Sequence, residues 1–175
     1  KSTLFNRLTR DGTLAEDRLF ATLDARLRRG ALDAERWPVL FADTVGFIRK
    51  LPHQLVEAFK ATLEETVLAD LIVQVVDGSE PESARAESIA AADAVLEEIG
   101  AGSTPRLLAM NKVDLLGEAE RRELSLRHRD AVLVSAETGE GLDELRSRIA
   151  SLIKQNLIEV DLLVPFADGE RLSEL

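Results

Sequence analysis

The residues most able to do chemistry form a short polar segment, Asn111-Lys112-Val113-Asp114, which follows the apolar run 107–110. The run predicts a buried strand, so the segment would lie at its carboxyl end, where open α/β sheets bind ligands. The Asp114 carboxylate could accept two hydrogen bonds from the N1 imino and N2 amino groups of guanine. Adenine lacks this donor pair and would leave the acceptor buried and unpaired. The segment therefore predicts a guanine-binding site.

The first three residues, Lys1, Ser2 and Thr3, match the end of a phosphate-binding loop. In the complete loop, a glycine-rich turn binds phosphates through backbone N–H groups. The lysine reaches the β and γ phosphates, and the hydroxyl that follows binds Mg²⁺. The glycines are not in the sequence. Alone, the segment favours a simpler interpretation, a helix that begins with a serine cap, so its assignment depends on the other motifs.

A third motif, Asp43-Thr44-Val45-Gly46, lies at the end of a predicted strand. The Asp43 carboxylate could hold Mg²⁺, usually through water, and Gly46 would let a backbone N–H approach a γ-phosphate closely. A fourth, Ser135-Ala136-Glu137, follows the apolar run 131–134. Small residues there would let backbone amides approach the edge of the base. Together the four motifs favour a nucleotide site over coincidence on a generic α/β scaffold.

These motifs resemble the G domain of translation-factor-related GTPases. Finer stretches are similar to the HflX family of ribosome-associated GTPases, and the resemblance covers essentially the whole chain. The stretches are Leu19–Asp24, Ala42–Ile48, Leu51–Val56 and Ala58–Thr66. The segment 51–66 is the most specific to the family, because it has no role common to all GTPases.

The resemblance implies a switch loop in which Thr22 closes on Mg²⁺ and the γ-phosphate and orders only with the triphosphate. On the sequence alone Thr22 has rivals, including Thr13, and only the family match selects it. The resemblance also implies that Lys1, Thr22 and Gly46 serve hydrolysis and that Ser2, Thr22 and Asp43 bind the metal. The implied nucleotide-binding set is Lys1, Ser2, Thr3, Phe20, Ala21, Thr22, Leu23, Asp24, Asp43, Thr44, Val45, Gly46, Asn111, Lys112, Val113, Asp114, Ser135, Ala136 and Glu137.

Phe47 stands where many GTPases place a glutamine that orients the attacking water. A phenyl ring cannot hydrogen-bond to water, so that mode of catalysis is absent at this position, even if Phe47 merely packs in the core. We therefore expect slow intrinsic GTP hydrolysis. For this family the resemblance implies acceleration by the large ribosomal subunit. It also implies an N-terminal domain, outside this sequence, that makes much of the ribosome contact.

The chain has 175 residues, with 45% hydrophobic and 31% charged side chains, which suits one globular domain. It has no cysteine, and only His53 and His128 carry imidazole, so a disulfide framework or a structural zinc site is excluded. No apolar run approaches the roughly 20 residues that span a bilayer. We expect a cytoplasmic monomer without a membrane span.

The net charge of −10 is unusual for a protein expected on RNA, since acidic domains are repelled by phosphate backbones. Two basic clusters could offset it locally. One contains Arg26, Arg28 and Arg29, and the other contains Arg121, Arg122, Arg127, His128 and Arg129. Solvated helix and loop surfaces explain the second cluster equally well, so charge alone does not indicate nucleic-acid binding.

Apolar strands alternate with helical patterns, which predicts an α/β, P-loop NTPase-type, doubly wound and mostly parallel sheet with helices on both faces. Its first strand would precede Lys1 and is missing. We expect a GTPase domain over 1–156, lacking that strand and most of the phosphate loop, and the start of a small C-terminal subdomain over 157–175. Expected strands lie near 27–32, 37–42, 71–76, 107–110 and 131–134, and expected helices near 1–10, 54–67, 79–99 and 141–154.

Two details of the central helix and its strand are specific enough to test. Ser79 with Glu82 fits a capping box, Pro81 suits a first turn, and Gly100 suits a C-terminal stop. The preceding strand, 71–76, is nearly all apolar, as expected for a parallel strand buried on both faces. Asp77 follows it and is more simply a turn or cap residue than a site residue.

Three alternatives remain open on the sequence. A non-catalytic fragment could form an incomplete nucleotide site and serve as a binding module. An adenine-specific P-loop ATPase or kinase is disfavoured by the segment 111–114 and by Ser135-Ala136. A related GTPase that acts on tRNA modification or membrane transport shares the general motifs, and only the segment 51–66 argues against it.

Overall fold

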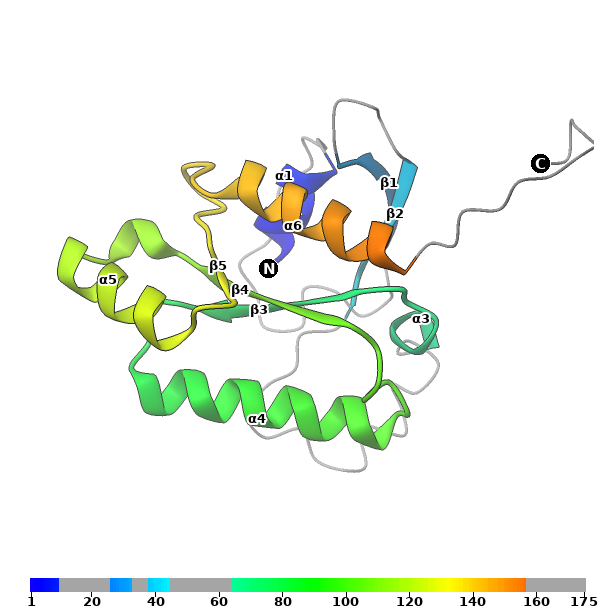
Figure 1. Ribbon diagram of the computed structural model, residues 1–175, viewed down its shortest axis with the longest axis horizontal. Helices are drawn as coiled ribbons and strands as arrows, with labels where there is room; N and C mark the ends of the chain where they lie inside the picture. The colour runs from blue at the N-terminus through cyan, green and yellow to red at the C-terminus, as the bar shows by residue number, and fades with distance from the viewer. Residues whose placement is uncertain (10–25, 33–37, 45–63, 157–175) are drawn as a thin grey trace, which may run out of the picture.

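The computed structural model describes residues 1–9, 26–32, 38–44 and 64–156 (Figure 1). Its elements in chain order are α1 (Ser2–Leu8), β1 (Arg26–Ala31), β2 (Pro38–Asp43), α3 (Glu64–Val67), β3 (Ile72–Asp77), α4 (Glu82–Glu98), β4 (Arg106–Asn111), the 3-10 helix η2 (Val113–Leu115), α5 (Glu118–Arg127), β5 (Val132–Leu133) and α6 (Leu142–Gln155). Strand and helix alternate over the second half of the chain, as the sequence predicts.

The second half builds a parallel sheet with strand order β3-β4-β5. α4 returns the chain from β3 to the start of β4, and α5 returns it from β4 to the start of β5, which is the connection parallel strands require. In Figure 1, α1 and α6 lie on one side of this sheet and α4 lies on the other. Leu124 of α5 packs in the same cluster as Ile89 of α4, so α5 covers the same face as α4. The expected doubly wound α/β arrangement is confirmed.

Side-chain alternation along β4 divides the core into two layers. Leu107 and Ala109 pack toward α1 and α6, whereas Met110 packs toward α5. Successive strand residues point to opposite faces, so one strand supplies both layers. The first layer is filled from α6 by Leu142, Leu145 and Ile149, which repeat at the helical spacing of three or four residues and are all at most 6% exposed.

The β1 and β2 strands form a separate antiparallel pair, in which Arg26 lies opposite Asp43 and Ala31 opposite Pro38. Phe41 and Val39 pack against the layer that contains Leu4 and Leu8 of α1. This packing places the end of β2 beside the start of α1. The two segments that carry the phosphate motifs are therefore neighbours.

The capping box expected at α4 is wrong. The helix begins at Glu82 with Pro81 as its N-cap, and no side chain caps it. The Ser79 hydroxyl instead donates to Asp77 Oδ1 (2.6 Å), because the turn at the end of β3 brings that carboxylate closer than the helix start. The expected stop is confirmed, since Gly100 has φ +83 and its N–H donates to the Glu97 carbonyl (3.1 Å).

Two other expectations need correction. β3 is only partly buried, apart from Val76, whereas its apolar sequence predicted burial on both faces. Among the described strands β3 pairs only with β4, so it lies at an edge of the sheet and its side chains have fewer neighbours. α5 was not anticipated as a separate helix, because it buries a single side chain, Leu124.

Some expectations fall outside the described residues. Only Glu64–Val67 of the helix expected at 54–67 belongs to them, and the proposed subdomain at 157–175 does not. The division of the chain at residue 156 stays a prediction. Within the described part, no helix combines the length and the apolar character needed to cross a bilayer.

Candidate functional site

The base side of the candidate site is built where β4 and β5 end. Asn111, the last residue of β4, is 6% exposed, and its Oδ1 accepts a hydrogen bond from the Ala136 N–H (2.9 Å). Next to it, the Val113 N–H donates to the Val134 carbonyl (3.2 Å). A buried amide that is satisfied in this way fixes the relative position of the two loops. The structure thus brings together the predicted segments 111–114 and 135–137.

Asp114 has an unsatisfied acceptor. Its Oδ1 is buried and has no hydrogen-bond partner among the described residues. Leaving a buried acceptor unpaired costs about 1–3 kcal/mol, so the carboxylate is suited to a ligand that brings donors. Guanine offers two adjacent donors, as the sequence argument requires. Val113, beside it, is 1% exposed and anchors the turn in the core.

The loop after β5 is compact and largely held by its own backbone. Ser135 is fully buried, its N–H donates to the Glu140 carbonyl (2.9 Å), and its hydroxyl accepts from the Thr138 N–H (3.0 Å). Ala136 is 4% exposed and its amide already serves Asn111. The Glu137 carbonyl accepts from Arg7 of α1 (2.7 Å). This last bond joins the loop to the helix that carries the phosphate motif.

The phosphate side is formed by the start of α1 and the end of β2. Asp43 is 3% exposed, and its Oδ1 pairs with Lys1 Nζ (3.0 Å) while its Oδ2 accepts from the Ser2 hydroxyl (3.0 Å). Lys1 Nζ also donates to the Thr44 carbonyl. Burial lowers the pKa of the Lys1 ammonium, and Asp43 acts in the opposite direction through its charge and its hydrogen bond. Thr3, in the first turn of α1, is exposed.

The Ser2 hydroxyl and the Asp43 carboxylate fit a magnesium site. Mg²⁺ binds oxygen ligands and usually keeps several waters, so one hydroxyl and one nearby carboxylate suffice on the protein side. The predicted residues of the switch loop (Phe20, Ala21, Thr22, Leu23 and Asp24) and two beyond β2 (Val45 and Gly46) lie outside the described residues.

Asp77 has more contacts than the sequence suggested. Its Oδ1 accepts from the Ser79 N–H (3.0 Å) and hydroxyl, which confirms the expected turn, and its Oδ2 pairs with Lys112 Nζ (2.7 Å). Burial raises the pKa of the Asp77 carboxyl, but hydrogen bonds from Lys112 and Ser79 outweigh it, so the net pKa is lowered. The only sequence signal was the position of Asp77 at a strand end.

Arg121 was assigned to a basic cluster, and the structure shows a more specific placement. Its Nε donates to the Leu116 carbonyl (3.1 Å), and its guanidinium pairs with Glu140 (2.6 Å). Arg121 therefore connects the turn that follows Asp114 with the loop that follows Ser135. No local pattern could have revealed this, since the partner Glu140 lies in another loop.

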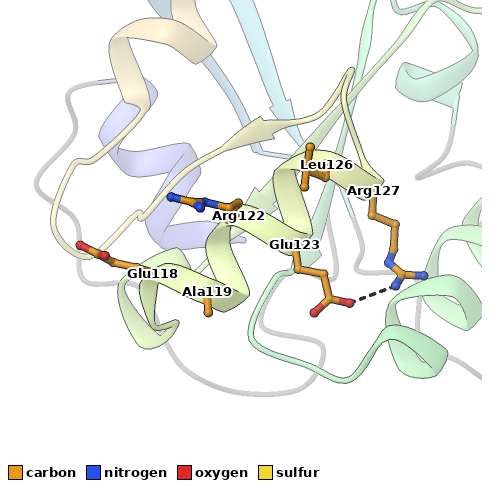
Figure 2. Close-up of a pocket in the computed structure, with 6 residues that line it drawn as sticks. All are labelled: Glu118, Ala119, Arg122, Glu123, Leu126 and Arg127. Atoms are coloured by element: carbon orange, nitrogen blue, oxygen red, sulfur yellow. Dashed lines mark hydrogen bonds and ion pairs between the residues drawn. The ribbon is translucent and has the colours of Figure 1, made fainter.

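Arg122 and Arg127 of that cluster lie on α5 and line a groove that is open to solvent (Figure 2). Arg127 pairs with Glu123 of the same helix (3.0 Å) and with Glu82 of α4 (3.8 Å), and His128, just past the end of α5, lies 3.6 Å from Glu82. The groove contains none of the predicted nucleotide residues, and the solvated-surface interpretation fits it best. Its lining residues are Glu118, Ala119, Arg122, Glu123, Leu126 and Arg127. In the first cluster, the Arg28 guanidinium lies over the Phe5 ring, 6.0 Å from its centre.

The chain is similar to known proteins in both sequence and fold. Residues 1–112 match the family described as "50S ribosome-binding GTPase". The chain is 47% identical to GTPase HflX of Magnetococcus marinus over 99% of its own length and 40% of that protein. It is 44% identical to GTPase HflX of Escherichia coli over 97% of its length and 39% of that protein. The chain thus spans about 40% of the length of these curated relatives.

A solved structure adds a likeness of fold at modest identity. A GTP-binding protein from the archaeon Sulfolobus solfataricus, crystallised in complex with GDP, superposes with a TM-score of 0.66 at 26% identity. The match covers 88% of this chain and 49% of that one. The P-loop type of fold expected from the motifs is confirmed by this likeness together with the parallel sheet.

Proposed function

Because the chain belongs to the 50S ribosome-binding GTPase family and matches HflX proteins over nearly its whole length, we propose that it forms the G domain of an HflX-type GTPase. In this proposal it binds GTP with Mg²⁺, hydrolyses it to GDP, and acts as a molecular switch on the large ribosomal subunit. The protein works in the cytoplasm as a monomer. Residues 1–156 form the G domain, and residues 157–175 begin a small C-terminal subdomain.

The observation that carries the proposal is the unsatisfied Asp114 Oδ1, beside the braced pair of Asn111 and Ala136. A carboxylate acceptor in a fixed position discriminates strongly, since a base without matching donors leaves it unpaired. An ATP-specific site has no use for this acceptor. In a protein that binds no nucleotide, the buried unpaired acceptor would lower stability and serve no function.

On the phosphate side, Lys1 and Asp43 take different roles once the nucleotide binds. The Lys1 ammonium leaves Asp43 and neutralises the β and γ phosphates, which carry more negative charge. Ser2 and Asp43 supply oxygen ligands for Mg²⁺, and Thr22 closes over the γ-phosphate. The Gly46 N–H approaches the same phosphate. Bound Mg²⁺ supplies charge that stabilises the transferring phosphoryl group.

Phe47 sets the expected pace of hydrolysis. Without a glutamine after Gly46, this chain has no side chain at that position to orient the attacking water. We expect slow intrinsic turnover that rises when the large ribosomal subunit binds. Turnover that is fast alone and unchanged by the purified subunit would refute the role of this partner.

Competition binding tests the nucleotide assignment. In the full-length protein, a fluorescent GDP analogue should be displaced by GTP and GDP at concentrations at least about a hundredfold lower than by ATP, as expected for two lost hydrogen bonds and a buried unpaired acceptor. Equal displacement by ATP would favour the adenine-specific alternative. Tight guanine binding with no phosphate release, even on ribosomes, would favour the non-catalytic binding module.

A further inference from the structure

Asp77 lies in register with the base-recognition segment. In the parallel pairing of β3 and β4, Asp77 is the partner of Asn111, and the next residue, Gly78, donates its N–H to the Asn111 carbonyl (2.7 Å). The end of β3 is thereby fixed to the end of β4. Because Lys112 follows Asn111 directly, its side chain begins within reach of the Asp77 carboxylate.

The Asp77 carboxylate is held in place independently of Lys112. Its Oδ1 accepts two hydrogen bonds from Ser79, one from the N–H (3.0 Å) and one from the hydroxyl (2.6 Å). Both come from the same turn, so the carboxylate cannot rotate without losing them. Its Oδ2 is left to face Lys112 Nζ at 2.7 Å. The acidic partner is therefore preorganised, and the lysine is the group that becomes ordered.

Lys112 has an unusual backbone conformation for its residue type. Its φ of 66° and ψ of 32° lie in the left-handed region, and among the described residues it is the one non-glycine residue with positive φ. Such a conformation costs roughly 1–2 kcal/mol for a residue with a Cβ. From this position the side chain reaches Asp77 at the end of β3. The side chain is 55% exposed, so without a partner it would sample many rotamers.

We propose that Asp77 is a positioning residue for guanine-nucleotide binding: it orders the Lys112 side chain across the strand ends before the base arrives. The inference rests on the proposed function, and in it the stem of the Lys112 side chain packs along the plane of the bound purine. A lysine that is already ordered loses less conformational freedom when the nucleotide binds, and this strengthens binding. Asp77 acts only through Lys112 and does not contact the nucleotide.

The test compares rates of GDP release. In the full-length protein loaded with a fluorescent GDP analogue, Asp77→Asn should release it about fivefold faster, the size expected for a partly exposed ion pair. The asparagine oxygen can still accept from Ser79, so the turn is retained. Ser79→Ala is the matched control, because it removes a hydroxyl from the same turn but leaves the carboxylate facing Lys112. Its release rate should stay within about 1.5-fold of the parent protein, well below a typical ion-pair effect.

A double-mutant cycle separates positioning from a general structural role. Lys112→Ala should speed release by itself, and Asp77→Asn should add nothing further in that background. The proposal is overturned if the double variant releases GDP faster than Lys112→Ala alone by the full factor seen for Asp77→Asn. It is also overturned if Asp77→Asn releases GDP at the same rate as Ser79→Ala. Melting curves check that each variant is folded. If the parent protein does not prefer GDP over ADP, the proposed function fails. If the parent prefers GDP but the two substitutions change the release rate independently, only the positioning role fails.

Discussion

The two sides of the candidate site are assembled by different kinds of contact. On the base side, backbone bonds join the loops, as between Val113 and Val134, and the Asn111 amide joins them again through Ala136. On the phosphate side, the contacts are made by side chains: Asp43 forms an ion pair with Lys1 and accepts a hydrogen bond from Ser2. Backbone bonds fix a pocket in advance, whereas an ion pair can be exchanged for a ligand of higher charge. In the proposed site, the fold thus fixes the groups that would recognise the base, whereas the ion pair on the phosphate side can be exchanged for a ligand.

The largest expected effect comes from breaking the base-side loop at Gly141. This residue has φ +73, and a Cβ there would overlap the Leu133 carbonyl of β5. Gly141→Ala should lower the free energy of unfolding by about 3 kcal/mol, from left-handed strain together with a clash against backbone that cannot rotate away. Denaturant unfolding without nucleotide measures it.

Gly139 is the matched control, since it has φ +92 in the same loop, but a Cβ added there would meet no atom within 4 Å. Gly139→Ala should cost only the strain, about 1 kcal/mol. Equal losses in the two variants would mean that close packing does not fix the base-side loop.

The next effect separates base recognition from stability. Asp114→Asn replaces a carboxylate whose Oδ1 is unsatisfied, so the nucleotide-free protein should be no less stable. GTP affinity should fall about a hundredfold, because a charge-assisted pair of hydrogen bonds is lost. Affinity for xanthosine triphosphate should rise, since xanthine presents an acceptor where guanine has its amino group. Unchanged GTP affinity would contradict the assignment of this pocket.

A smaller effect is expected on the phosphate side. Asp43→Asn removes the charge of the proposed metal ligand but leaves an oxygen near Ser2, so the Mg²⁺ concentration needed for GTP binding should rise about tenfold. The preference for guanine over xanthine should stay as it is, because Asp43 contacts Lys1 and Ser2 on the proposed phosphate side. A magnesium titration of GTP binding measures the shift. A changed base preference would show that the two sides are coupled.

Sequence reasoning succeeded where the signal is local and failed where the partner is distant. The apolar strand before Asn111 and the spacing of Leu142, Leu145 and Ile149 predicted the elements and their buried faces, because periodicity records burial directly. No pattern in the sequence indicates the ion pair between Arg121 and Glu140, since it joins a helix to a loop in another part of the chain.

The same distinction explains the error at Ser79. Its spacing from Glu82 matches a capping box, but spacing cannot show that a carboxylate at Asp77 competes for the hydroxyl. The burial of β3 was overestimated for a related reason. The apolar sequence of a strand indicates that its side chains favour burial, whereas their actual exposure depends on which strands pair with it.

The smallest expected effect is the pH dependence contributed by Asp77, and it tests whether its carboxylate is charged in the folded protein. Burial opposes the charge, but hydrogen bonds from Lys112 and Ser79 give a net folded-state pKa below the ordinary 3.8. A lowered carboxyl pKa adds stability that is present above pH 3.8 and lost as the pH falls through the folded-state value. Since the group is partly exposed, the contribution should be below about 1 kcal/mol.

Subtracting the unfolding free energy of Asp77→Asn from that of the parent protein isolates this contribution. Glu82 also has a lowered pKa, caused mainly by a hydrogen bond from Arg85, but it is present in both proteins and cancels. The difference should be constant from neutral pH to about pH 5 and then shrink toward more acidic pH. A difference that grows on acidification would mean that burial prevails, and that Asp77 is neutral when it meets Lys112. Lys112 would then not be ordered by an ion pair, and the base side would lose the fixed lysine that contrasts with Lys1, whose pair with Asp43 can be exchanged.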